Sequence, residues 1–298
     1  MKVQANGLAI EVEDTGPVGP GAPVLLVMGL GMQLIAWPDP LVDALVRAGH
    51  RVVRFDNRDI GLSAGFDHLG TPNLLWEGMK MRVGLPVRAP YTLHDLAADA
   101  LGVLDALGIA QAHVVGASMG GMIAQRMALA APQRVLTLTS IMSSSGARHL
   151  PGPRPHVLQV MLSRPRDHSE SVLLAHYVRL FEAIGSPGYP SSQEELRQRI
   201  LSSVRRGGYR PAGSVRQLAA VAADTRRAQE LVRIAAPTLV LHGTDDPLVP
   251  LACGEDTARR IPGARFLAIP GMGHDLPPAV VERLLDPLLP HLRLGSPQ

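Results

Sequence analysis

A serine flanked by two glycines carries the clearest chemical signal in the sequence. Ser118 is the central residue of a Gly-x-Ser-x-Gly motif bounded by Gly116 and Gly120. A β-branched pair at 114–115 precedes the motif, and an apolar run with helical spacing at 122–131 follows it. This order predicts a strand, a sharp turn and a helix, which together present a serine as a nucleophile. Both glycines are expected because a Cβ at either position would clash where the helix packs close to the strand.

A serine hydroxyl needs a general base, and the base needs an acid that orients it. Both occur later in the chain, each just after a strand-like run. Asp245 and Asp246 follow residues 239–241, and His274 follows residues 265–269. The order serine, aspartate, histidine is that of one class of serine hydrolases. Neither a His-x-x-x-His motif nor a cysteine cluster occurs, so the sequence predicts no metal site, and the chemistry requires no cofactor.

Together these motifs resemble those of the α/β-hydrolase fold family, over essentially the whole chain. The resemblance implies that the catalytic acid is the aspartate of Gly-x-x-Asp-x-x-x-Pro. In this chain that residue is Asp246, with Gly243 before it and Pro250 after it. Asp245 stays open as an alternative acid. The Gly-x-Gly-His turn of the family ends here at His274, which is therefore the implied base.

The resemblance also implies an oxyanion hole made of two backbone N-H groups. One belongs to Met119, directly after the nucleophile, and the other to Leu30, in the loop after an early strand. The family often has His-Gly in that loop, whereas this chain has Met28-Gly29. Because the donors are backbone groups, this substitution changes the support of the loop more than its donors.

The segment 56–63 resembles the Asp-x-Arg-Gly-x-Gly-x-Ser turn of the family, with Asp59 in place of the usual glycine. We expect an Asp/Arg network there that holds the active-site loops, rather than a catalytic role. Met32, Trp37 and Met142 are candidates for lining an apolar substrate pocket. Ordinary core packing is the alternative for all three, since methionine fills irregular gaps anywhere.

Hydrophobic periodicity predicts strands that alternate with helices, and therefore an α/β protein with a mostly parallel sheet flanked by helices. An opening antiparallel pair is expected around the Asn-Gly dipeptide at 6–7. Further strands are expected at 24–28, 51–55, 112–115, 135–142, 237–241 and 265–269, and helices at 34–48, 92–107, 122–131 and 279–292.

A different pattern fills the region between residues 143 and 234. Four helix-like stretches occur there without a clear strand, at 157–162, 171–184, 192–204 and 214–231. An insertion at this place would cover the carboxyl ends of the strands, where open α/β sheets bind ligands. We therefore expect a first part of the core at 1–143, a helical cap at 144–235 and a second part of the core at 236–298.

Composition excludes several other classes of protein. The formal net charge is +3, and arginines are scattered as doublets without interleaved aromatic residues, which argues against nucleic-acid binding. The single cysteine, Cys253, forms no intramolecular disulfide. No signal peptide and no run of eighteen apolar residues occurs, so we expect a cytoplasmic protein without a membrane span. Its oligomeric state is left open.

The predicted chemistry is hydrolysis of a carboxylic ester through an acyl-enzyme, with a small-molecule ester as the partner. The motifs are similar to those of the anthracycline methylesterase group, which implies a methyl or other small alcohol ester. A lactonase, a thioesterase, a proline iminopeptidase and a cofactor-free haloperoxidase use the same triad and stay open. A ligand-binding receptor on this fold is the non-enzymatic alternative.

Overall fold

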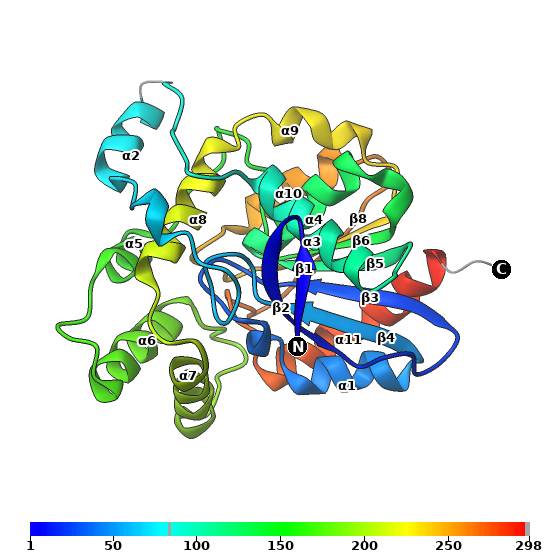
Figure 1. Cartoon of the computed structure of the whole chain (residues 1–298), viewed down its shortest axis with the longest axis horizontal. Coiled ribbons are helices and arrows are strands. Elements are labelled where there is room, and N and C mark those ends of the chain that lie inside the picture. The colour runs from blue at the N-terminus through cyan, green and yellow to red at the C-terminus, as the bar shows by residue number, and fades with distance from the viewer. Residues whose placement is uncertain (83–84, 296–298) are drawn as a thin grey trace.

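The computed structural model describes residues 1–82 and 85–295. Within them, eight strands form one sheet (Figure 1). The strands are β1 (Lys2–Ala5), β2 (Leu8–Asp14), β3 (Gly21–Val27), β4 (His50–Phe55), β5 (Ala112–Ala117), β6 (Val135–Ile141), β7 (Thr238–Gly243) and β8 (Arg265–Ile269). Their order in the sheet is β1-β2-β4-β3-β5-β6-β7-β8. β2 pairs antiparallel with β1 and β4, and all other neighbours are parallel, so the predicted mostly parallel sheet is confirmed.

Helices cover both faces of the sheet, as the family resemblance implies. The helices that flank the sheet are α1 (Asp39–Arg47), α3 (Leu93–Ala106), α4 (Met119–Ala130), α10 (Leu251–Arg260) and α11 (Pro278–Leu292), whereas α2 (Leu74–Arg82) contacts α8 (Pro211–Ala223), a helix between β6 and β7. In Figure 1, α1 and α11 lie together below the sheet, and α3, α4 and α10 lie on the opposite side.

Alternation along the strands explains why both faces are covered. On β3, Val24 and Leu26 pack into the cluster beside α1 and α11, whereas Leu25 and Val27 pack into the cluster with α3 and α4. All four side chains are fully buried. Strands that are apolar on both faces need helices on both faces, which is the usual setting of a parallel sheet.

The region between β6 and β7 is helical, as the sequence predicts. It contains α5 (Pro155–Leu162), α6 (Glu170–Ile184), α7 (Gln193–Gly207), α8 (Pro211–Ala223) and α9 (Arg227–Glu230). Figure 1 shows α5, α6 and α7 set to one side of the sheet. α6 and α7 share a small apolar cluster built on Leu174, Leu196 and Ile200. We refer to residues 144–235 as the helical insertion.

Two predicted helices are wrong in their extent. The helix expected at 214–231 is broken after Ala223, because the Asp224 carboxylate binds the guanidinium groups of Arg126 and Arg227. The helix expected at 34–48 begins only at Asp39. Pro38 has an extended backbone there and Pro40 occupies the first turn, a position that tolerates proline because its N-H would be unpaired anyway.

Two further helices, α2 and α10, had no counterpart in the sequence-based expectation. In α10 the buried positions are Cys253, Gly254, Asp256 and Thr257, which are small or polar, so hydrophobic periodicity is weak there. Within residues 1–82 and 85–295, no helix is long and apolar enough to cross a lipid bilayer.

Candidate active site

Ser118 lies at the turn between β5 and α4, in the backbone conformation of a strained elbow. Its φ is 56° and its ψ is −122°, a left-handed region that non-glycine residues rarely adopt. A Cβ at 116 would collide with the carbonyl of Gly120, and a Cβ at 120 with the carbonyl of Val27. The two motif glycines therefore let helix and strands approach closely enough to force this turn.

Hydrogen bonds from the next strand hold the elbow in place. The N-H of Ser118 donates to the carbonyl of Ile141 at 2.9 Å. The hydroxyl of Ser143, two residues after Ile141, donates to the carbonyl of Ser118 at 2.7 Å. Both peptide groups of the strained residue are thus tied to the end of β6, which fixes the direction of the serine side chain.

The side chains of Ser118, His274 and Asp246 form one hydrogen-bonded row. Nε2 of His274 lies 2.9 Å from Oγ of Ser118, and Nδ1 lies 2.7 Å from Oδ2 of Asp246. His274 and Asp246 are buried, while Ser118 is partly exposed. With Asp246 ionised, Nδ1 carries the proton and Nε2 accepts from the serine hydroxyl, which is the arrangement a general base requires.

The two adjacent aspartates have separate partners. Oδ1 of Asp246 accepts the N-H groups of Leu248 and Val249, at 2.9 and 2.8 Å, which leaves Oδ2 for His274. Oδ2 of Asp245 accepts the N-H of Gly271 at 3.1 Å and so links the acid turn to the histidine loop. The structure brings Asp246, and not Asp245, to the imidazole.

A second imidazole lies behind the acid. His242 is fully buried, and its Nε2 donates to the carbonyl of Val249 at 2.7 Å while lying 3.6 Å from Oδ2 of Asp246. Burial lowers the pKa of His242 and outweighs the opposing effects of Val249 and the Asp246 charge. This shift favours the neutral imidazole of His242, which places no positive charge beside Asp246 in competition with His274.

The end of α6 supports the histidine loop. The N-H of His274 donates to the carbonyl of Ile184 at 2.7 Å, and the N-H of Gly273 donates to the hydroxyl of Ser186 at 2.8 Å. The same hydroxyl donates to the carboxylate of Asp275, whose pKa is raised by burial. The helical insertion therefore holds the backbone that carries the imidazole of His274.

The loop after β3 lies against the serine. A Cβ at Gly29 would lie 3.1 Å from the Cβ of Ser118, tighter than ordinary contact, so the missing side chain lets the loop approach. Leu30 follows in this loop, and Met119 begins α4, where the first N-H groups have no partner within the helix. The structure thus brings the backbones of both predicted donors to the neighbourhood of Ser118.

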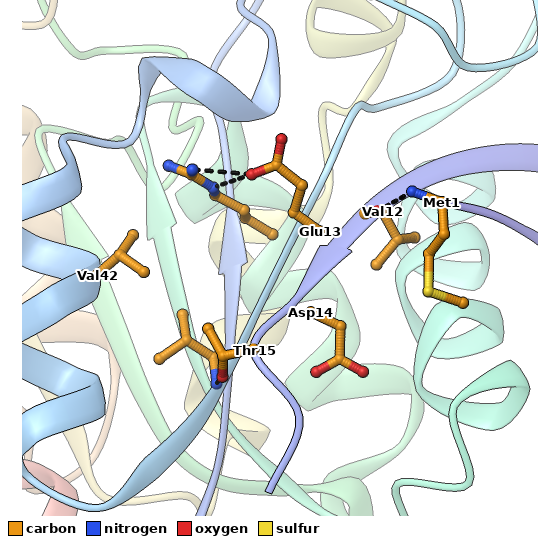
Figure 2. Close-up of a pocket in the computed structure, with 8 residues that line it drawn as sticks. Met1, Val12, Glu13, Asp14, Thr15 and Val42 are labelled. Atoms are coloured by element: carbon orange, nitrogen blue, oxygen red, sulfur yellow. Dashed lines mark hydrogen bonds and ion pairs between the residues drawn. The ribbon is translucent and has the colours of Figure 1, made fainter. Parts of the chain in front are cut away.

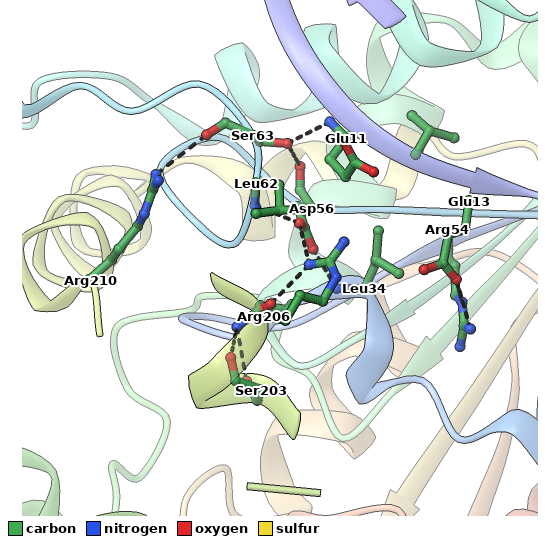
Figure 3. A network of polar contacts seen from close by, with 12 residues as sticks. Glu11, Glu13, Leu34, Arg54, Asp56, Leu62, Ser63, Ser203, Arg206 and Arg210 are labelled. Carbon is green, nitrogen blue, oxygen red and sulfur yellow. Dashed lines mark hydrogen bonds and ion pairs between the residues drawn. The ribbon is translucent and has the colours of Figure 1, made fainter. Parts of the chain in front are cut away.

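Asp56 belongs to the turn at 56–63, for which a structural role is expected. It holds the end of the loop after β3 that lies farther along the chain, at Leu34. Its buried carboxylate accepts the N-H of Leu34 at 2.7 Å and that of Leu62 at 2.9 Å. Arg206 of α7 donates to the same carboxylate at 2.7 Å (Figure 3). The insertion, the turn and the loop after β3 therefore meet on one carboxylate.

Asp59, which replaces the usual glycine of this turn, has φ 74° and pairs with Arg216 of α8. The pair is bidentate, with two distances of 2.7 Å, and both side chains are buried. Burial alone raises the pKa of Asp59, but its bonds to Arg216, Tyr91 and Phe66 outweigh that effect, so the pKa lies below its usual value. The carboxylate is a fixed anion that anchors α8.

The three pocket candidates lie in or against the core cluster beside α1 and α11. Trp37 has no exposed surface and packs in this core cluster, the alternative stated for it above. Met142 is buried just after β6 with φ 41°. Met32 is partly buried and packs against the same cluster. Met32 and Met142 stay candidates by their proximity in sequence to the Leu30 loop and to Ser143.

Sequence reasoning missed Ser143, Ser186 and Gln217, which support the catalytic loops. Ser143 lies two residues after the end of β6, and a position just after a strand is the same signal that identified the aspartates. Gln217 is fully buried on α8, and Ser186 follows the last turn of α6. No local pattern marks either residue, because their partners are far away in the sequence.

A separate groove of about 450 Å³ lies beside β2, β4 and α1 (Figure 2). Its carboxylates are already paired, Asp14 with Arg51 at 2.6 Å and Glu13 with Arg54 at 2.8 Å. None of the three residues of the Ser118 row lines it. The groove is therefore not part of the candidate active site.

Comparison with known proteins places the chain in a family. The sequence model of the alpha/beta hydrolase fold matches residues 22–277. The chain is 34% identical over 294 residues to rhodomycin D methylesterase DnrP of Streptomyces peucetius, covering 92% of each chain, and equally similar to DauP of a Streptomyces strain. A meta-cleavage product hydrolase from Pseudomonas fluorescens IP01 superposes with a TM-score of 0.74 at 20% identity, covering 98% of this chain and 97% of its own. The chain belongs to the esterases of the α/β-hydrolase fold family.

Proposed function

We propose that the protein hydrolyses carboxylic esters through a Ser118-His274-Asp246 triad and an acyl-enzyme intermediate. The observation that carries this proposal is the continuous row of two hydrogen bonds, 2.9 Å from Ser118 to His274 and 2.7 Å from His274 to Asp246. The strained elbow adds support, because backbone strain of this kind persists where the surrounding structure enforces it at a functional residue.

In the acylation step, Oγ of Ser118 attacks the ester carbonyl while Nε2 of His274 takes the hydroxyl proton. The carbonyl oxygen becomes an oxyanion, which the N-H groups of Leu30 and Met119 stabilise. Asp246 holds the imidazole in orientation and stabilises its positive charge. The intermediate then collapses, the bond to the alkoxy oxygen breaks, and His274 returns the proton to the departing alcohol.

In the deacylation step, water replaces the alcohol. His274 removes a proton from the water, whose oxygen attacks the acyl carbon and forms a second oxyanion in the same hole. Collapse breaks the bond to Ser118 Oγ, which recovers its proton from His274. The products are a carboxylic acid and an alcohol, and no external cofactor enters the balance.

The helical insertion serves as the cap of this site in our proposal. Its contacts with the loops of Gly31, Leu34 and His274 support that role. A methyl or other small alcohol ester is the proposed substrate class. The relatives DnrP and DauP, both named rhodomycin D methylesterases, support it together with the motif resemblance.

Turnover of p-nitrophenyl acetate, butyrate and octanoate by the wild type and Ser118→Ala tests the mechanism. We expect the variant to lose almost all activity, since removal of the nucleophile leaves only residual catalysis from the oxyanion hole and binding. Activity that survives the substitution would contradict the serine mechanism. A fluorophosphonate adduct located on Ser118 by mass spectrometry provides a check that is independent of substrate choice.

A panel of methyl, ethyl, lactone and thioester substrates tests the substrate class. We expect the highest kcat/KM on a methyl ester. A preference for the lactone or the thioester would keep the triad mechanism and overturn the proposed class.

A further inference from the structure

Gln217 of α8 joins two loops of the core through one side-chain amide. Its Oε1 accepts the N-H of Gly31 at 2.9 Å, and its Nε2 donates to the carbonyl of Arg58 at 2.9 Å. The side chain is fully buried. Both ends of the amide are therefore used on backbone groups, the N-H of Gly31 and the carbonyl of Arg58, which lose these bonds when the amide is removed.

The bond to Gly31 acts on the peptide unit next to the proposed oxyanion donor. Gly31 has φ 72°, and it follows Leu30 directly. The planar Leu30–Gly31 peptide includes the Cα of Leu30, so the bond to the Gly31 N-H restrains that Cα, where the preceding Gly29–Leu30 peptide with the proposed donor N-H ends. On the other side, Nδ2 of Asn57 donates to the carbonyl of Met28 at 2.9 Å. The loop of residues 28–31 is thus held by hydrogen bonds at both ends.

We infer that Gln217 is a positioning residue for the oxyanion hole, which it orients from the helical insertion. This inference rests on the proposed function. Asn57 fixes the loop from the core, whereas Gln217 fixes it from α8, so the oxyanion hole is complete only when α8 is docked. α8 is itself anchored by the neighbouring pair of Arg216 with Asp59.

Through Gln217, the helical insertion contributes to stabilisation of the transition state. The end of α6 holds the backbone of His274, and α8 holds the loop of Leu30 through the N-H of Gly31. An insertion bonded to both catalytic loops is a fixed wall of the site, and its helices do not move away without displacing the loops that carry the base and the donor.

The test is Gln217→Met, which keeps the length of the side chain but removes both hydrogen bonds to the loops. An oxyanion donor that is misplaced loses its effect on the transition state, so we expect kcat to fall roughly 10- to 100-fold. KM should change little, because the ground-state carbonyl gains less from the hole than the oxyanion does. A trifluoromethyl ketone, which forms an oxyanion adduct with Ser118, should bind more weakly by a similar factor.

Gln125→Met is the matched control. Gln125 is also a fully buried glutamine, and its Nε2 contacts the carbonyl of Ser144 at 3.4 Å. Loss of this amide should lower stability at most, and leave the ratio of kcat to KM close to that of the wild type. If Gln217→Met fails to fold, Gln217→Ala replaces it, because water can enter the space left by the shorter side chain and satisfy the two backbone groups without orienting them.

Hydrogen exchange separates this inference from the proposed function. In the peptide that spans residues 24–37, the Gly31 amide should exchange faster in the Gln217 variants than in the wild type or Gln125→Met. Unchanged kcat in a folded Gln217 variant, with Ser118→Ala inactive, would overturn the inference and leave the ester mechanism intact. Absence of ester turnover by the wild type would instead overturn the proposed function.

Discussion

At the scale of single residues, Asp246 and Asp245 show how neighbouring carboxylates acquire different tasks. Asp246 faces the imidazole with Oδ2, while its Oδ1 is held by two backbone N-H groups. Asp245 turns toward Gly271. Sequence spacing reduced the candidates for the catalytic acid to these two aspartates and favoured Asp246. The direction of each side chain depends on the turn that follows β7, and a sequence motif does not specify that direction.

Replacement of each aspartate by asparagine is expected to distinguish the role of Asp246 from that of Asp245. In Asp246→Asn the amide no longer stabilises the imidazole tautomer that accepts the serine proton, so kcat should fall by about 10⁴-fold. In Asp245→Asn the amide oxygen still accepts the Gly271 N-H, and kcat should change little. Steady-state kinetics on p-nitrophenyl butyrate measure both, and equal losses in the two variants would refute the assignment of Asp246.

At the scale of elements, the anchoring of α8 explains a departure from the family turn. Asp59 occupies a left-handed position where glycine is usual, and a non-glycine residue there costs about 1–2 kcal/mol. The bidentate bond to the buried guanidinium of Arg216 offsets this cost. The unfavourable backbone conformation of Asp59 is therefore coupled to a favourable ion pair between the turn at 56–63 and the helical insertion.

Asp59→Gly should lower stability despite relieving the strained backbone. It leaves Arg216 buried with its remaining partners, the carboxylate of Asp67 and the carbonyl of Gly70. Removing one partner of a buried pair costs about 3–5 kcal/mol, which exceeds the relieved strain, so we expect a net loss of about 2 kcal/mol. The double variant Asp59→Gly/Arg216→Met should regain most of it. Urea unfolding measures both, and a stabilised single variant would show that the strain dominates.

Sequence periodicity located the strands and most core helices, because their buried faces are apolar. The same reasoning placed Ser118, Asp246 and His274 after strands, where the structure has them. It did not find α10, whose buried face is small and polar, nor the break at Asp224, which depends on Arg126 more than ninety positions earlier in the chain. Contacts such as Gln217 with Gly31 leave no local signature, so the supports of the site were invisible until the fold brought them together.

At the scale of the whole molecule, buried histidines make stability depend on pH. His113 is fully buried on β5, and burial, with smaller contributions from the charges of His50 and His291, lowers its pKa from 6.5 to about 4. Between these values the unfolded chain binds a proton that the folded chain does not. The free energy of unfolding should therefore fall by about 3 kcal/mol for this group as the pH drops from 6.5 to 4, with no such loss above 6.5.

His113→Asn should reduce this sensitivity to acid, because asparagine stays neutral over the whole range. The comparison is the urea midpoint of the wild type and of the variant at pH 7.5 and at pH 5. The wild type should lose more stability than the variant between the two values. His176, His242 and His291, whose pKa values are also lowered by burial, contribute to the dependence that stays in the variant. An identical dependence in both proteins would rule out His113 as a source.

The strand order has a consequence for the protein while it is being synthesised. Ser118 and the Leu30 loop belong to the first part of the chain, whereas β7 and β8, which lead to Asp246 and His274, follow the insertion and extend the sheet from β6 to its edge. A nascent chain that ends within the insertion therefore holds Ser118 without its proposed base, and such a hydroxyl is a poor nucleophile. In the proposed mechanism, addition of the last two strands extends the sheet and brings His274 to Ser118 in the same event, so we expect a chain on the ribosome to stay inert toward esters until its fold is complete.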